Sequence, residues 1–209
     1  MDEKQNKDLY SYEYDYDNLY CYKDSIVLKN KLNIKDKDKF FKAEREITSL
    51  RTTQALVNPI KGNFDEDHLK AIHRFLFSDI YEWAGEIRTI NISKGNSFCQ
   101  ALYIEDFLIK LFKELKKENY LDNLDEETLI KRLSYYLGEI NAIHAFREGN
   151  GRTQRLFVTY LARRQGYDLQ FSNVEPEDMI DASYNSFIGD YDKMDALIAK
   201  CLIKLEKED

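Results

Sequence analysis

Hydrophobic residues recur at three- and four-residue intervals along most of the chain, which is the spacing of amphipathic helices with one buried face. The first expected helix is predicted to bury a face made of Phe40, Ile47, Leu50 and Leu56. The pattern predicts helices at about 36–57, 65–84, 104–115, 126–143 and 151–165, one that starts near Pro176, and a last one at about 190–206.

Residues that begin and end helices stand where this pattern needs them. Asp36 and Asp65 are good N-cap residues, and Gly166 follows the fifth expected helix as a C′ residue does. The chain has 2 prolines and 8 glycines, so few residues break helices and the fold is expected to be all-α.

Residues 86–104 differ from the rest of the chain. The stretch from Arg88 to Ile92 is β-prone, Lys94-Gly95-Asn96 has turn chemistry, and Phe98 resumes an apolar pattern. We predict one β-hairpin here, the only convincing one in the sequence. It is either a plain surface hairpin or an exposed edge that pairs with an extended segment of another protein.

The N-terminal region, 1–35, is predicted to be a tyrosine-rich arm, followed by one domain at 36–209. Four tyrosines alternate with polar residues, which suggests extended chain: Tyr10, Tyr12, Tyr14 and Tyr16. Either the rings lie on the body of the protein, or the exposed hydroxyls become modified. No internal repeat or inter-domain linker is visible.

Composition excludes several classes of protein. A net charge of −7 and a pI near 5.2 argue against a general nucleic-acid-binding surface. Three widely spaced cysteines, Cys21, Cys99 and Cys201, indicate reduced thiols and not a disulfide framework or zinc site. No apolar run approaches the ~18 residues that a membrane span needs. The sequence therefore predicts a cytoplasmic location.

The segment from His144 to Arg155 carries the chemistry. It joins two expected helices, and the second begins at Gly149-Asn150-Gly151, where unpaired backbone N–H groups and the helix dipole attract anions. Arg152 and Arg155 project from one side of the first turn, and their guanidinium groups suit phosphate oxygens. This pattern predicts a polyphosphate site.

Glu148 is an acid inside this basic site. A carboxylate there would repel phosphate unless it binds Mg²⁺, the usual counterion of phosphates. His144 supplies an imidazole that can accept a proton from a hydroxyl. The alternative is a helix–loop–helix corner with a capping Asn150 and surface arginines, but five such residues in register favour nucleotidyl or phosphoryl transfer.

The segment resembles the signature of Fic proteins, HxFx(D/E)GNGRxxR. Every specified position is met, by His144, Phe146, Glu148, Gly149, Asn150, Gly151, Arg152 and Arg155. The stretch from Tyr81 to Gly95 also resembles the family's segment that leads into its flap hairpin, so the resemblance covers about 36–205.

The resemblance implies a Fic-type helical bundle with a flap, and transfer of AMP from ATP to a Tyr, Ser or Thr hydroxyl of a target protein. By it, His144 takes the hydroxyl proton, Glu148 holds Mg²⁺, and Phe146 only packs. The phosphates are bound by Gly149, Asn150, Gly151, Arg152 and Arg155. The target backbone is aligned by the flap, with Thr89, Ile90, Asn91, Ile92, Lys94 and Phe98.

Two positions of the motif differ from those of some relatives. Ala145 replaces a proline that many members have, at an unspecified position of the motif. Relatives that phosphorylate their targets have lysine at the position of Gly151 and a shortened motif, so the resemblance favours AMP transfer.

Regulation is also implied by the resemblance. Many members have an inhibitory helix with [ST]xxxE[GN], and no such motif is visible here. The chain thus resembles the class restrained by a separate small antitoxin protein, also in its stretch at 27–32. DNA gyrase and topoisomerase IV subunits would then be targets.

Alternative hypotheses for the activity remain. The fold could use another phosphate-linked donor, or bind nucleotide without turnover. His68 and His73 do not form HExxH and are expected at the surface or core edge.

Overall fold

The computed structural model describes residues 19–94 and 96–206, and within them the expected all-α fold with a small hairpin is confirmed. Two antiparallel strand pairs accompany the helices: β1 (Ser93–Lys94) with β2 (Asn96–Ser97), and β3 (Tyr167–Leu169) with β4 (Leu202–Lys204). Short 3₁₀ turns lie at Ala101–Tyr103, Asn119–Leu121 and Phe171–Asn173. The helices are α1 (Lys37–Val57), α2 (Glu66–Phe77), α3 (Ile104–Lys117), α4 (Glu126–Ile143), α5 (Asn150–Arg164), α6 (Pro176–Phe187) and α7 (Asp192–Cys201).

Local sequence explains where several helices begin. Asp36, Asp65 and Asp125 each accept a hydrogen bond at 2.9 Å from the backbone N–H three residues later. Each side chain thereby satisfies an amide that has no partner inside its helix. After α5, Gly166 takes a left-handed conformation with φ +80°, as its predicted role as a C′ residue requires.

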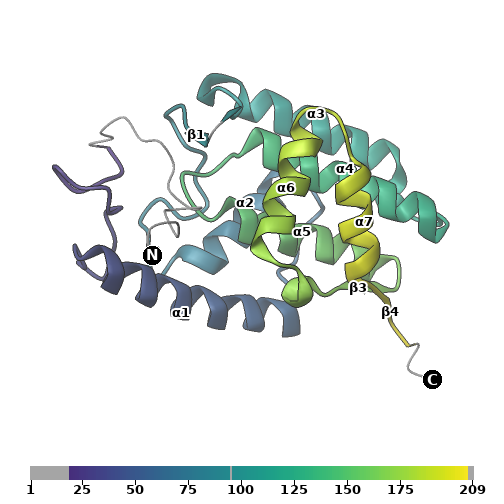
Figure 1. Ribbon diagram of the computed structural model, residues 1–209, viewed down its shortest axis with the longest axis horizontal. Coiled ribbons are helices and arrows are strands. Elements are labelled where there is room, and N and C mark those ends of the chain that lie inside the picture. The colour runs from purple at the N-terminus through teal and green to yellow at the C-terminus, as the bar shows by residue number, and fades with distance from the viewer. Residues whose placement is uncertain (1–18, 95, 207–209) are drawn as a thin grey trace, which may run out of the picture.

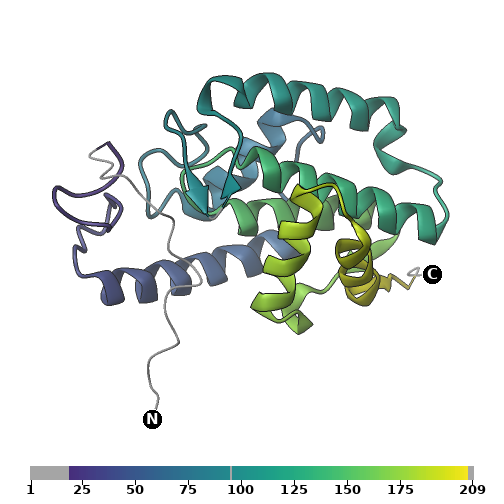
Figure 2. The ribbon, with the colours of Figure 1, turned by 45° about the horizontal axis from the view of Figure 1, so that its top comes forward.

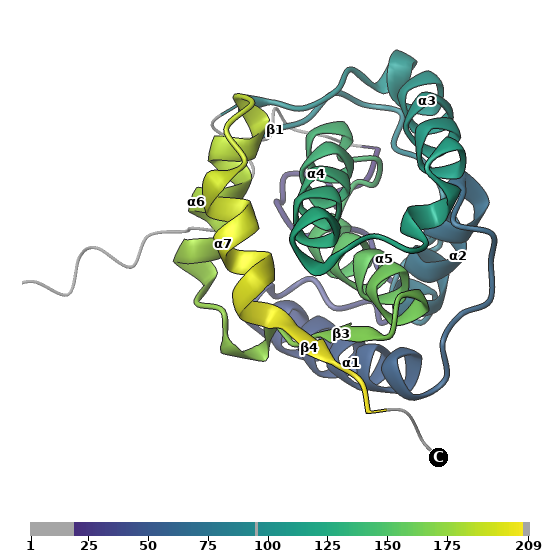
Figure 3. The same ribbon diagram turned by 90° about the vertical axis from the view of Figure 1, so that its right-hand side faces the viewer.

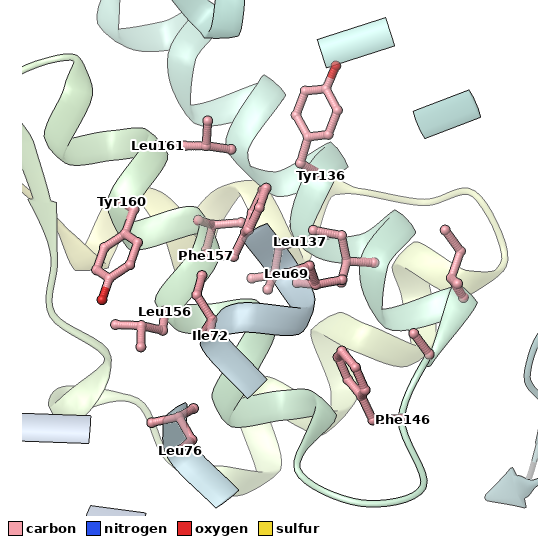
Figure 4. Packing of buried hydrophobic residues seen from close by; sticks show 14 of the residues in the cluster. Leu69, Ile72, Leu76, Tyr136, Leu137, Phe146, Leu156, Phe157, Tyr160 and Leu161 are labelled. Atoms are coloured by element: carbon pink, nitrogen blue, oxygen red, sulfur yellow. The ribbon is translucent and has the colours of Figure 1, made fainter. Parts of the chain in front are cut away.

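The helices α4 and α5 lie at the centre of the molecule (Figure 3). In Figure 3 the other helices surround them, with α2 and α3 on one side and α6 and α7 on the other. The helix α1 runs along the bottom of Figures 1 and 3, and Figure 2 shows α3 above α4. Their buried faces form one core, to which Leu69 and Ile72 of α2, Leu137 of α4 and Phe157 of α5 contribute (Figure 4). This core fixes the loop between α4 and α5.

The predicted buried face of α1 is wrong in part. Phe40 is buried, but Leu50 is 61% exposed and Leu56 is also exposed. The face toward α5 carries Glu44 and Thr48 instead, and both are buried. Polar groups can be buried when they are hydrogen-bonded, and here Arg152 of α5 supplies the donors.

Three further sequence predictions need correction. The second helix ends at Phe77 and is followed by turns up to Gly85, so it is shorter than expected. The last helix ends at Cys201, because residues 202–204 pair with β3. The hairpin at β1 and β2 is therefore not the only strand pairing in the described chain.

The described end of the N-terminal region packs against the body. Cys21 and Leu28 form an isolated β-bridge, and both are buried with Val27. The alternating tyrosines from Tyr10 to Tyr16 lie outside the described residues, and the division of the chain at residue 35 stays a prediction. In the described part of the chain, no helix is both long and apolar enough to cross a membrane.

Candidate active site

The loop at 144–149 joins α4 to α5 through two left-handed residues. His144 caps α4 with φ 50°, and its N–H donates to the Ile140 carbonyl at 3.0 Å. Gly149 precedes α5 with φ 81°. A non-glycine residue rarely adopts the left-handed region, so His144 is strained in the manner of many functional residues.

The ring of His144 is held from two sides. Its Nδ1 lies 3.1 Å from the Asn141 carbonyl oxygen, and the Phe98 ring stacks on it with centroids 3.7 Å apart. A carbonyl only accepts hydrogen bonds, so Nδ1 carries the proton and, in the neutral ring, Nε2 is the unprotonated nitrogen. Nε2 is therefore the atom that can act as a base.

The N-terminus of α5 presents backbone donors. The first intrahelical bond runs from the Thr153 N–H to the Gly149 carbonyl, so the N–H groups of residues 150–152 have no acceptor within the helix. The Gly149 N–H donates to Glu148 Oε1 at 2.8 Å. Such a helix start suits an anion, and phosphate binding by it stays a prediction.

The Asn150 side chain is committed to the loop. Its Oδ1 accepts from the Phe146 N–H at 2.8 Å, and its Nδ2 donates to the Phe146 carbonyl at 2.7 Å. The side chain is 4% exposed. Asn150 thus shapes the loop, and its predicted phosphate binding would have to come from its backbone N–H.

Arg152 is fixed by residues of α1. Its guanidinium donates to Glu44 Oε1 at 2.7 Å and to Thr48 Oγ1 at 2.8 Å, and it lies over the Phe77 ring. Glu148 Oε1 is 3.5 Å away. Burial raises the pKa of Glu44, and the Arg152 charge opposes this shift. Two carboxylates therefore flank this arginine.

Arg155 lies one turn further along α5, with its guanidinium against Gly151. Both Arg152 and Arg155 line a cavity of about 290 Å³ between α1, α5 and β3. A larger cavity of about 480 Å³ lies between residues 63–67 and α3, and no motif residue lines it. The smaller cavity is the one next to the candidate chemistry.

The residues present fit a Mg²⁺ ion that is shared with a nucleotide. Glu148 is the acid of the motif, and among described residues its Oε2 receives no hydrogen bond. No group of three or more His, Cys, Asp or Glu residues in the described chain could hold a metal ion. Mg²⁺ in phosphate-transfer sites typically takes one or two carboxylates and completes its shell with phosphate oxygens and water, so a single carboxylate suffices.

His73 supports the loop, and both it and His68 are buried, so of the two expected positions, surface or core edge, the surface one is wrong for both. His73 Nδ1 accepts from the Gly85 N–H at 2.8 Å, so its Nε2 donates to the Glu148 carbonyl at 3.0 Å. Its ring stacks on Phe146 at 3.9 Å. Burial lowers the pKa of His73 to about 3.

A neutral buried His73 makes the protein sensitive to acid. Its folded-state pKa lies below the unfolded value, so its contribution is full above about pH 6.5 and is lost as the pH falls toward 3. Between pH ~7 and ~5, the protonation of this one group in the unfolded state lowers the free energy of unfolding by about 2 kcal/mol. When the free energy of unfolding is measured in urea, His73→Gln should lose about 2 kcal/mol less than wild type between pH ~7 and ~5. An equal loss of unfolding free energy in both proteins would contradict a neutral His73.

The flap begins with residues whose polar groups bind the body. Tyr20 Oη accepts from the Thr89 N–H at 3.3 Å, and Asn91 Oδ1 accepts from the Ala101 N–H at 2.8 Å. Ile92 is buried and Ile90 half-buried. Phe98 lies on His144, so the structure places the flap beside the predicted base. The side chain of Lys94 lies outside the described part.

Sequence reasoning missed the residues that hold the motif in place. Glu44 and His73 lie on helices as polar residues among many, and nothing in their spacing indicates contact with Arg152 or Glu148. Arg88 is also buried, and it donates to the His144 carbonyl. Of these residues, the sequence pattern could have singled out only Arg88, because it is the single cation in a β-prone stretch.

Comparison with solved structures gives close matches. The chain aligns with BepC of Bartonella tribocorum, solved with bound AMPPNP, at 25% identity and a TM-score of 0.85, over 90% of this chain and 97% of that one. A Fic domain of a Bartonella quintana protein, solved with bound ADP, aligns at 29% identity and a TM-score of 0.86, over 90% and 96%.

Comparison of sequences agrees with the comparison of structures. The chain is 42% identical to the protein adenylyltransferase VbhT of Bartonella schoenbuchensis, over 84% of this chain but only 37% of that protein. It is 42% identical to the probable protein adenylyltransferase y4lH of Sinorhizobium fredii, over 87% of this chain and 94% of the relative. Residues 63–162 match the Fic/DOC family. The chain therefore belongs to the Fic/DOC family, in which the relatives that it matches are named as protein adenylyltransferases.

Proposed function

We propose that this chain is a protein adenylyltransferase that transfers AMP from ATP to a hydroxyl of a target protein. The observation that carries the proposal is the position of the His144 imidazole, with its proton on Nδ1, in the same short loop as the backbone N–H groups at the start of α5. The names of the relatives and the nucleotides bound in related structures support it.

The reaction follows from the site. The target hydroxyl oxygen attacks the α-phosphorus of ATP, a new P–O bond forms, and the bond to the pyrophosphate oxygen breaks. The hydroxyl proton moves to Nε2 of His144. Backbone N–H groups at residues 150–152, with Arg152 and Arg155, hold the negative charge of the phosphates. Pyrophosphate leaves.

Mg²⁺ belongs to this proposal as the partner of Glu148. Bound there, it supplies positive charge that neutralises the phosphate oxygens and favours departure of pyrophosphate. Glu148 is held for this role by the Gly149 N–H and, through its backbone carbonyl, by His73. In this site the carboxylate would hold the metal and the arginines would orient the phosphates.

The proposals for the target protein and for the control of the activity rest on the sequence resemblance alone. The 209 residues contain no [ST]xxxE[GN] motif, and the resemblance at 27–32 favours control by a separate small antitoxin protein. Within this proposal the chain acts in the cytoplasm as a toxin, and subunits of DNA gyrase or topoisomerase IV are targets. Purifying the chain with its bound partners tests the antitoxin directly.

Labelled ATP tests the reaction type. With Mg²⁺ and a bacterial lysate, α-³²P-ATP should label a protein band and γ-³²P-ATP should not. Removing Mg²⁺ with EDTA should reduce the label by at least ~100-fold, because the phosphate charges are then balanced only by the arginines and the backbone N–H groups of α5. Labelling from γ-³²P-ATP alone would identify a kinase. Nucleotide binding without any label, on every target tried, would favour a binding module.

A further inference from the structure

Arg88 is a buried arginine between the flap and the candidate active site. It is 1% exposed, although a guanidinium is costly to bury unless its donors are satisfied. Its backbone N–H donates to the Ala145 carbonyl at 3.0 Å, which anchors the residue against the loop. The side chain then reaches both α4 and the flap.

Toward α4, the guanidinium contacts the end of the helix. Nε donates to the His144 carbonyl at 2.8 Å, and one terminal nitrogen lies 3.4 Å from the Ile143 carbonyl. A cation at a helix C-terminus is favoured by the helix dipole and by carbonyls that lack intrahelical partners. This contact also fixes the left-handed backbone of His144.

Toward the flap, the same group binds both stems. One terminal nitrogen donates to the Ile90 carbonyl at 2.6 Å and the other to the Cys99 carbonyl at 2.5 Å. These residues stand on either side of β1 and β2, so a single side chain joins the entry and the exit of the flap. Cys99 is next to Phe98, whose ring stacks on His144.

We infer that Arg88 is a positioning residue that sets the flap and the His144 ring at a fixed distance from each other. This inference rests on the proposed function, in which the flap aligns the target beside His144. Arg88 reaches neither Arg152 nor Arg155 in these contacts, so it governs target alignment and proton transfer and leaves ATP binding alone. Only a guanidinium has the forked donors that reach three carbonyls in different directions.

Arg88→Lys keeps the charge and removes the fork. We expect kcat to fall about 100-fold and KM for the target to rise, because a small misplacement of reacting groups has an effect of this size. KM for ATP should stay within ~2-fold. The amides of Phe98 and Cys99, which donate to the Ile92 and Ala142 carbonyls, should exchange hydrogen at least ~10-fold faster.

Arg163→Lys is the matched control. Arg163 also donates to a backbone carbonyl, that of Leu56, but it joins α5 to the end of α1, away from the flap. This variant should leave flap exchange and target KM unchanged. Arg88→Met, which fills the same space without donors, should resemble Arg88→Lys in flap exchange if it folds.

The readouts separate this inference from the proposed function. Flap exchange and the NMR signals of the His144 ring report positioning even if no AMP transfer is found. Unchanged flap exchange and unchanged His144 signals in Arg88→Lys would overturn the inference. It would equally be overturned if exchange rose uniformly over all helices and both KM values changed together, since Arg88 would then only stabilise the fold.

Discussion

Replacing His144 by alanine should lower AMP transfer by about 10³-fold while ATP binding stays within ~2-fold of wild type. The ring supplies the unprotonated Nε2 that would accept the proton, and general-base catalysis contributes about 10²–10⁴-fold. The phosphate-binding donors lie on α5 and do not depend on the ring. The measurement is the initial rate of label transfer from α-³²P-ATP, with nucleotide affinity from calorimetry.

His68→Gln is the matched control for this variant. His68 is buried, and its ring binds the Ile60 carbonyl at 2.8 Å. It lies in the first turn of α2, away from the motif. Its replacement should reduce stability but leave the rate per folded molecule unchanged. If His144→Ala retained the wild-type rate, or lost activity only together with ATP binding, the proposed proton transfer would be wrong.

Gly149→Ala should abolish most activity by a different route. Gly149 has φ +81°, and an added Cβ would lie 2.3 Å from Cε2 and Cζ of Phe77. Phe77 is buried and stacked against His73, so its ring cannot move aside. The loop must therefore shift, and with it the amides that start α5. We expect a loss of at least ~100-fold in kcat/KM.

Gly166→Ala separates the two causes of this loss. Gly166 has almost the same φ, +80°, but nothing lies within 4 Å of an added Cβ. It should cost only the left-handed strain, roughly 1–2 kcal/mol, and leave activity intact. Urea unfolding of both variants should show a larger loss for Gly149→Ala. Equal stability losses with full activity in both would contradict the close packing of the loop on Phe77.

The parts of the fold that could be predicted are those set by local rules. Asp36 and Asp65 cap helices because the geometry of a cap involves only neighbouring residues. The motif was recognisable because a carboxylate, an imidazole, glycines and two guanidinium groups stand within twelve residues. The start of α5 lay where the glycines predicted it.

The parts that could not be predicted depend on contacts between distant residues. Glu44 lies on α1, 108 positions before Arg152, and a hydrophobic pattern cannot show that a buried face is polar. The same holds for β4, because three residues at the end of a helical pattern pair with a strand far earlier in the chain. Tertiary contacts override periodicity at these places.

The polar support of the motif links stability to activity. Glu44 and Thr48 hold Arg152 from α1, His73 holds Glu148 from α2, and Arg88, just before the flap, holds His144. The matched Fic/DOC segment, 63–162, includes the last two supports but not α1. The anion site of this chain is therefore completed by a helix outside that segment.

The most direct test of the central claim is the product itself. A modified target protein, purified after reaction with ATP, is analysed by mass spectrometry, and the released pyrophosphate is counted in the same reaction. If the chain transfers AMP through His144, one adenylyl group should appear on a Tyr, Ser or Thr oxygen for each pyrophosphate released, and neither product should form with His144→Ala. A phosphoryl group on the target with release of ADP would contradict it.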